Sequence, residues 1–282
     1  MVMAAVTLVT LMCQQGTAKV STYGGVMTSW KPIGSAEVFA MAKDFDSCER
    51  GMQIHGGFPL CWPWAVFEGP QGCKIHGVTR YCDWTVKSRT DSSVVLELNE
   101  NAETLKVWPH RFHLELTYAI SNRLEVTFRA VNTDDHPYAC TELFHPYFNV
   151  GDVTRCRVTG MDGLKYFWKG EADQGDQRRW SGDFAASAFK SAVPGYVFEQ
   201  GDCTHQIVDE ALGRRLQISY AGNIKLCIWN SGVDFSVCGE SECPDFGRRF
   251  LCFEGGTLYR DRAYVLKPGE THVLKAAVSI VK

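Results

Sequence analysis

Two short stretches of this sequence place a proton-transferring side chain among apolar neighbours. The stretch ELFHPYFN, residues 142–149, puts His145 directly before a proline, and FLCFEGGTL, residues 250–258, puts Glu254 after four apolar residues. An imidazole changes its charge near neutral pH, and a carboxyl group in a dry environment has its pKa raised toward the same range. Together the two side chains have the chemistry of a general acid and a general base.

Each of these residues also has a purely structural interpretation. A single histidine with aromatic neighbours, such as His145, is often a core residue with its hydrogen bonds satisfied. Glu254 would be an ordinary carboxylate at a sheet edge if it paired with one of three arginines that are close in sequence, Arg248, Arg249 or Arg260. The residue types alone leave both interpretations open.

A third stretch, residues 54–80, is too rich in glycine and proline to form the interior of a strand. Its polar members include His55, His76 and Arg80. Such a loop is either a compact structural Ω-loop or a functional one. The two tryptophans of its CWPW sequence are either core aromatics or a platform on which a sugar ring stacks.

The segments that must position these residues are predicted to be β-strands. Apolar and polar residues alternate with a period of two, for example in residues 112–121 and 123–132, and Gly, Asn, Asp and Pro separate the runs. Helical periodicity is weak, and only residues 181–193 predict a helical turn or two. We therefore expect an all-β fold, one large antiparallel β-sandwich, with residues 1–282 forming a single domain.

The composition excludes several classes of protein. The 29 basic and 32 acidic residues are spread along the chain without the basic clusters of a nucleic-acid interface, so we expect no nucleic-acid partner. The twelve cysteines show no C-x-x-C pair and no zinc-finger spacing, which suits buried thiols in a reducing, cytoplasmic environment. No stretch is long and apolar enough to predict a transmembrane helix, and residues 1–13 are interpreted as an opening strand rather than a signal peptide.

Eight motifs together carry a resemblance to a known family. They follow one another in the order GGVMTSWKP, GGFPLCWPW, HGVTR, ELFHPYFNVGDV, VTGMDGLKY, IWN, FEGG and LKPGE. This ordered set resembles the aldose 1-epimerase (mutarotase) family, and within it the hexose-6-phosphate 1-epimerase branch. The resemblance runs from about Val6 to about Val281.

The resemblance implies a galactose mutarotase-like β-sandwich and an enzyme that interconverts the α and β anomers of a sugar. In that reaction a carboxylate takes the proton of the C1 hydroxyl while an imidazolium protonates the ring oxygen, so acid and base are expected to face each other across the sugar. By position in the motifs, His145 corresponds to the acid and Glu254 to the base. The chemistry requires no metal or organic cofactor, and we expect a monomer whose partner is a small sugar or sugar phosphate.

The resemblance also implies residues that bind the substrate. His76 and Arg80 match the family's HG..R element, in which the histidine lies by the sugar and the arginine helps to bind phosphate. Asp202 resembles an aspartate that hydrogen-bonds sugar hydroxyls.

One departure concerns the phosphate. The phosphate branch has Arg-Gly-Gly where this chain has His55-Gly56-Gly57, which leaves Lys74 and Arg80 as the cations and His55 as a contributor when protonated. A free hexose is therefore the alternative substrate. A sugar-binding module without catalysis is the alternative of another class.

Overall fold

The computed structural model describes residues 7–42, 50–66, 69–168, 178–186, 195–222, 224–232, 245–258 and 263–281. Its largest element is a nine-stranded antiparallel sheet. In sheet order the strands are β14 (Phe184–Ala185), β12 (Cys156–Thr159), β16 (Cys203–Asp209), β17 (Arg214–Ala221), β21 (Thr271–Val281), β8 (Leu124–Asn132), β7 (Phe112–Ile120), β6 (Ser93–Asn99) and β5 (Thr85–Arg89).

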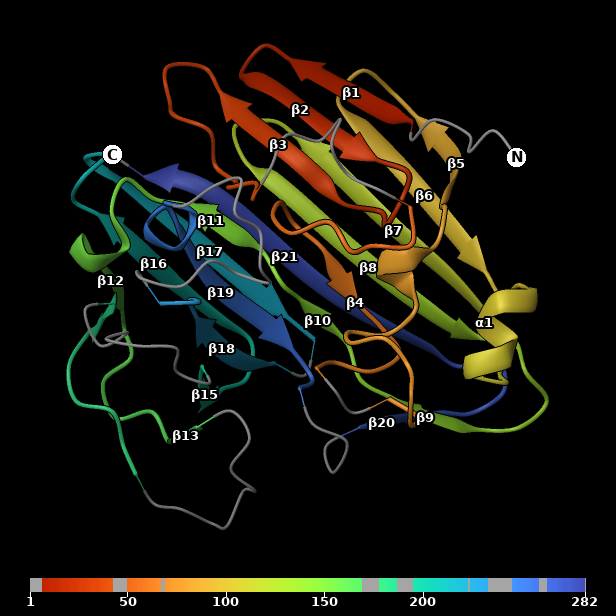
Figure 1. Ribbon diagram of the computed structural model, residues 1–282. Coiled ribbons are helices and arrows are strands. Elements are labelled where there is room, and N and C mark those ends of the chain that lie inside the picture. Colours follow the sequence, from red (N-terminus) through yellow and green to blue (C-terminus); the bar gives the residue numbers. More distant parts are fainter. Residues whose placement is uncertain are drawn as a thin grey trace.

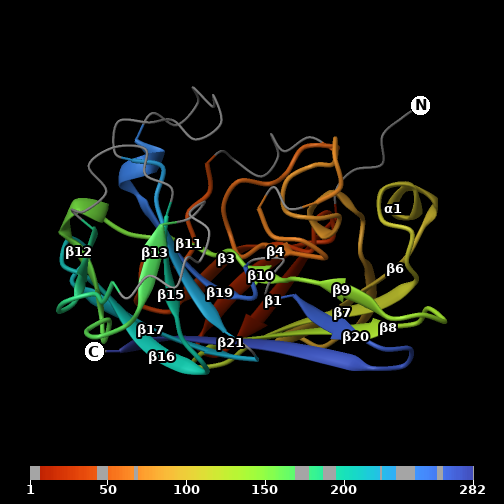
Figure 2. The same cartoon turned by 90° about the horizontal axis from the view of Figure 1, so that it is seen from below.

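A seven-stranded antiparallel sheet forms the second layer (Figure 2). Its order is β13 (Tyr166–Trp168), β15 (Tyr196–Glu199), β18 (Lys225–Trp229), β19 (Phe250–Gly256), β10 (Leu143–Phe144) and β4 (Leu60–Cys61), and β11 (Tyr147–Asn149) also pairs with β19. β19 is thus an interior strand of this sheet.

Smaller elements complete the layers. A three-stranded sheet lies over β6, β7 and β8 (Figure 1), and its strands are β1 (Leu8–Cys13), β2 (Gly16–Ser21) and β3 (Met27–Pro32). A two-stranded sheet pairs β9 (Tyr138–Cys140) with β20 (Tyr264–Leu266). The helices among the described residues are α1 (Ala102–Val107) and the 3-10 turns η2 (Thr79–Tyr81), η3 (Val153–Arg155) and η6 (Phe246–Arg248).

The core lies between the layers, because every second residue of the long strands points into it. In β7 and β8 buried positions alternate with more exposed ones along the whole strand. Two tyrosines of the large sheet reach across the core to the backbone opposite. Tyr118 donates to the carbonyls of Gly25 and Phe58 at 2.8 and 3.0 Å, and Tyr220 donates to the carbonyl of Phe253 at 2.6 Å.

The expected β-sandwich is confirmed, and the strands predicted from alternation are present. In the segment predicted to contain a helical turn or two, residues 181–193, Phe184–Ala185 form β14 beside β12 and Ala186 has a 3-10 conformation, whereas residues 187–193 lie outside the described residues. Within the described part of the chain, no helix combines the length and the apolar character needed to cross a bilayer.

Candidate active site

Glu254 points away from the large sheet because of the alternation along β19. Leu251 and Phe253 belong to the core between the sheets, so Cys252 and Glu254 face the opposite side of the strand. Gly255 makes this arrangement possible, since a Cβ atom at this position would lie 2.5 Å from the ring of Tyr220. The carboxylate is therefore fully buried on an interior strand, and the interpretation of Glu254 as a sheet-edge residue is wrong.

His145 lies between two short strands, β10 and β11, that both pair with β19. This shared neighbour brings the imidazole beside the carboxylate, with His145 Nε2 3.5 Å from Glu254 Oε1. The side chains are 4% and 0% exposed. The two groups are adjacent rather than separated by the width of a sugar, which differs from the expected placement across the substrate.

His76 joins this pair. Its ring meets that of His145 edge to face, with 5.1 Å between centroids, and the Val66 N–H donates to His76 Nδ1 at 3.1 Å. An Nδ1 that accepts a hydrogen bond leaves Nε2 to carry the proton of a neutral imidazole. His76 also has a φ of 68°, a left-handed conformation that is costly outside glycine and that clusters at functional sites.

The loop that carries His55 is bound by its backbone to the His145 segment. The N–H of His145 donates to the carbonyl of Pro59, and that of Tyr147 donates to the carbonyl of Gly57, both at 2.9 Å. Gly57 has a φ of 70°, and a Cβ atom there would lie 2.4 Å from a backbone oxygen. His55 is buried two residues before this glycine, and its Nε2 contacts the Gln53 amide.

The predicted cations hold the start of the same loop. Arg80 in η2 is only 1% exposed, and its Nη2 donates to the carbonyl of Ile54 at 2.6 Å. Lys74 is exposed, donates to the carbonyl of Gly51 at 2.5 Å, and lies over a tyrosine ring. Both cationic side chains therefore hold backbone carbonyls of the segment that precedes His55.

Arg50 is a third cation at this loop that the sequence interpretation missed. It forms an ion pair with Asp83 and lies over the ring of Tyr23, whose hydroxyl donates to the carbonyl of Met52. Its only signal in the sequence was its place shortly before the glycine-rich stretch. Lys74 and Arg80 therefore both donate to carbonyls of residues 50–54, the segment to which Arg50 itself belongs.

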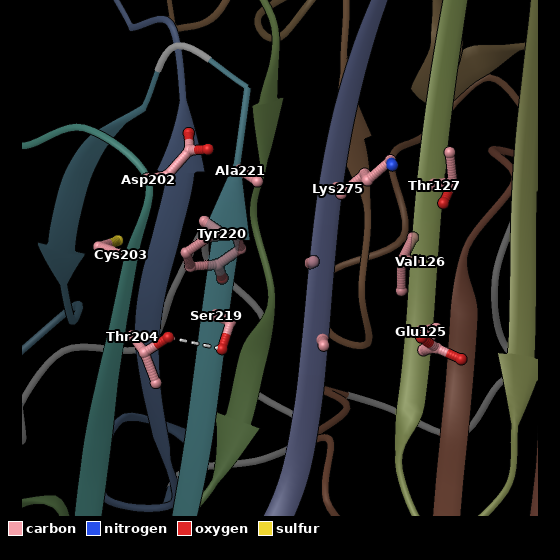
Figure 3. A pocket seen from close by; sticks show the side chains of 12 residues that line it. Glu125, Val126, Thr127, Asp202, Cys203, Thr204, Ser219, Tyr220, Ala221 and Lys275 are labelled. Atoms are coloured by element: carbon pink, nitrogen blue, oxygen red, sulfur yellow. Dashed lines mark hydrogen bonds between the residues drawn. The ribbon is translucent and has the colours of Figure 1, made fainter.

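The structure does not bring Asp202 to this site. Asp202 directly precedes β16 and lines a groove of about 470 Å³ on the outer face of the nine-stranded sheet, together with Thr204, Ser219 and Lys275 (Figure 3). Its carboxylate accepts from the Gly222 N–H at 2.9 Å. His145 and Glu254 belong to the other layer of the sandwich, so the expectation that Asp202 acts beside them is not supported.

Three further residues surround the His145–Glu254 pair. Tyr147 stacks on His145 with 5.0 Å between ring centroids, and Trp229 meets the same imidazole at 6.0 Å. Cys252 lies across the sheet from both aromatic residues, and its thiol is buried. Tyr147 could have been found from its position two residues after His145, on the same face of an extended chain.

The tryptophans of the CWPW sequence are core residues. Trp62 is fully buried and packs edge to face on Trp108 and Phe112, and Trp64 is 5% exposed. Neither presents an open face to a sugar, so the stacking-platform alternative is not supported. Among the described residues, Trp229 is the indole closest to this role, because it is only half-buried and contacts His145.

Comparison with known proteins finds a family match over most of the chain. Residues 7–279 match the model of a family described as aldose 1-epimerase. The chain is 29% identical to the Escherichia coli (strain K12) protein named "Putative glucose-6-phosphate 1-epimerase" over 85% of this chain and 79% of the relative. It is 28% identical to the protein of that name from Cenchrus ciliaris over 94% and 81%.

Solved structures show the same fold. A "putative mutarotase" from Salmonella typhimurium superposes with a TM-score of 0.84 at 24% identity, covering 98% of this chain and 91% of that one. A "galactose mutarotase related enzyme" from Lactobacillus acidophilus gives a TM-score of 0.78 at 18% identity, with 98% of both chains covered. The expected galactose mutarotase-like fold is confirmed, and the family match supports an epimerase. The chain belongs to the aldose 1-epimerase family.

Proposed function

We propose that the protein interconverts the α and β anomers of an aldohexose, with a hexose 6-phosphate as the preferred substrate. The observation that carries this proposal is the buried contact between His145 Nε2 and Glu254 Oε1, 3.5 Å apart. Glu254 lies on β19, and His145 lies between the two strands that pair with β19. A binding site needs no aligned acid and base, so this pair favours the enzyme over a sugar-binding module.

In the proposed reaction Glu254 takes the proton of the C1 hydroxyl while a protonated His145 gives its proton to the ring oxygen. The C1–O5 bond breaks, O1 becomes the aldehyde oxygen, and the C1–C2 bond rotates before the steps reverse with the opposite face of the aldehyde. O1 and O5 are both bonded to C1, so an acid and a base that lie side by side can reach both. The adjacency of His145 and Glu254 is therefore compatible with this chemistry.

His76 is the proposed sugar-binding neighbour of this pair. Its neutral form carries a proton on Nε2, because Nδ1 accepts from the Val66 backbone. A donor fixed in this way suits a sugar oxygen. The left-handed backbone of His76 supports the assignment, since such strain is usually retained where a side chain has to be aimed.

The phosphate preference rests on the cations at residues 50–55. Arg80, Lys74 and Arg50 gather at the loop that also presents His55, and several relatives are named for glucose 6-phosphate. A guanidinium or ammonium group binds phosphate through charge-assisted hydrogen bonds. A free aldose is the second candidate, because Arg80 and Lys74 already donate to backbone carbonyls.

The test compares kcat/KM for glucose 6-phosphate with kcat/KM for glucose and for galactose. Polarimetry or exchange NMR measures the rates of anomer exchange. We expect the phosphate ester to be preferred, and Arg80→Ala to raise its KM by about tenfold, the usual loss for a charge-assisted contact. Free glucose is the matched control, since damage to the Ile54 contact would affect both sugars equally. A ratio near one in the unmodified protein would assign it to free aldoses, and no acceleration with any sugar would favour a binding module.

A further inference from the structure

A second group of imidazole and carboxylate side chains lies outside the candidate active site. His110 precedes β7, whereas Asp134 and His136 belong to the connection from β8 to β9, near α1 (Figure 1). Asp134 Oδ2 is 3.5 Å from His110 Nδ1 and 3.5 Å from His136 Nε2. The three ligand atoms all lie within 4.8 Å of one another.

Each imidazole directs one ring nitrogen at the Asp134 carboxylate. His136 Nδ1 is 2.8 Å from the Asp135 carboxylate, so Nδ1 carries the proton and the neutral ring has its lone pair on Nε2. His110 Nδ1 is buried and lies 3.5 Å from Asp134 Oδ2.

The carboxylate is held in place by the backbone. The N–H groups of Arg111 and Asp135 donate to its two oxygens, at 3.1 Å to Oδ2 and 3.0 Å to Oδ1. Two ring nitrogens and one carboxylate oxygen thus converge on one point, and together they form a donor set that a transition metal ion can bind.

We propose that His110, Asp134 and His136 bind a divalent first-row transition metal ion. Ligands about 2.1 Å from a tetrahedral ion are about 3.4 Å apart, which matches the two 3.5 Å separations. Two imidazoles and one carboxylate select Zn²⁺, Ni²⁺, Co²⁺ or Cu²⁺ over Mg²⁺ and Ca²⁺, which prefer oxygen ligands. The Asp135–His136 hydrogen bond is the outer contact that orients a metal-binding histidine.

An ion at this place would join two parts of the fold that are distant in sequence. It would connect the start of β7 to the β8–β9 connection at one end of the large sheet. His136 is 53% exposed and His110 is 23% exposed, so an ion can enter from solvent. The remaining coordination positions would be filled by water.

Titration calorimetry of the full chain with Zn²⁺ alone and Ni²⁺ alone, near neutral pH, tests the proposal. We expect one ion per chain, and at least a 100-fold loss of affinity in His136→Gln and in His110→Gln. Asp135→Asn should weaken binding by about 10- to 100-fold, as outer contacts do. His113→Gln is the matched control, because His113 has the same 23% exposure as His110 and also lies beside a carboxylate, but belongs to no such group.

Three results would overturn the proposal. The first is no binding by the unmodified protein, and the second is equal affinity in His136→Gln. The third is loss of binding in His145→Asn with retention in His136→Gln, which would place the ion among His145, Cys252 and Glu254. Thermal unfolding without metal shows whether each variant is folded, and His136, the most exposed of the three ligands, is the safest position to change.

Discussion

The two places where imidazole meets carboxylate in this protein are built in opposite ways. His145 lies between two strands and Glu254 lies on a third. Their side chains are 3.5 Å apart, and both are almost fully buried. His110, Asp134 and His136 have the same spacing but lie in connections, with two rings open to solvent. The same separation between imidazole and carboxylate therefore occurs at two sites whose proposed chemistry differs.

The difference lies in the environment of the carboxylate. Asp134 accepts two backbone N–H groups, which stabilise a carboxylate's charge, and it lies between two ring nitrogens. Glu254 is fully buried on an interior strand, and an equally buried imidazole, His145, lies 3.5 Å from its carboxylate. The first arrangement suits ion binding and the second suits proton transfer.

The largest expected effect separates the two sites by activity. Glu254→Gln and His145→Asn should each slow anomer exchange by about 10² or more, the usual scale for a positioned proton-transfer group. Exchange NMR with the preferred sugar measures the rates, and Zn²⁺ affinity should be unchanged in both variants. Glu115→Gln, on the side of β7 that faces solvent, is the control. Folded variants with normal exchange rates would show that the buried pair is structural.

A smaller effect distinguishes the two sites by the pH dependence of Zn²⁺ binding. Protons compete with the metal for the two imidazoles, so Zn²⁺ affinity should be fully present where both rings are neutral and lost as the pH falls and the rings are protonated. In that range we expect affinity to fall roughly tenfold per pH unit and per proton. Calorimetry at stepped pH gives the curve. A constant affinity down to the titration range of carboxylates would mean that the imidazoles are not ligands.

The smallest effect concerns Asp202, which faces the outer groove of the large sheet. Asp202→Asn keeps an oxygen for the Gly222 N–H, so we expect kcat/KM to change by less than roughly twofold, the scale of surface substitutions. Steady-state rates with glucose 6-phosphate and glucose provide the measurement. A loss comparable to that of Glu254→Gln would show that Asp202 reaches the sugar after all.

Local patterns predicted much of the fold. β7 and β8 were expected because their alternation is uninterrupted over nine residues each. α1 was not expected, since its six residues have no helical periodicity and depend on a capping box between Asn101 and Thr104. β10 and β11 are too short to carry a pattern, although they position His145.

The sites were predictable to different degrees. The strand end at Glu254 and the aromatic run around His145 pointed to chemistry, but their contact depends on β19 pairing with both flanking strands. Asp202 was predicted from a loose motif match, and the structure places it at the outer groove of the large sheet, so its contact with the sugar stays a prediction. The His110 group joins residues more than twenty positions apart, and no short motif contains them.

Gly255 ties the position of the Glu254 carboxylate to the packing beneath it. The Tyr220 ring fills the space where any larger side chain would stand, and its hydroxyl is anchored on the carbonyl just before Glu254. Positions 220 and 255 are therefore expected to covary among relatives, with a larger residue at 255 tolerated only beside a smaller one at 220. The loop of residues 50–80 can therefore change independently, whereas the height of the Glu254 side chain above the core depends on residues 220 and 255 together.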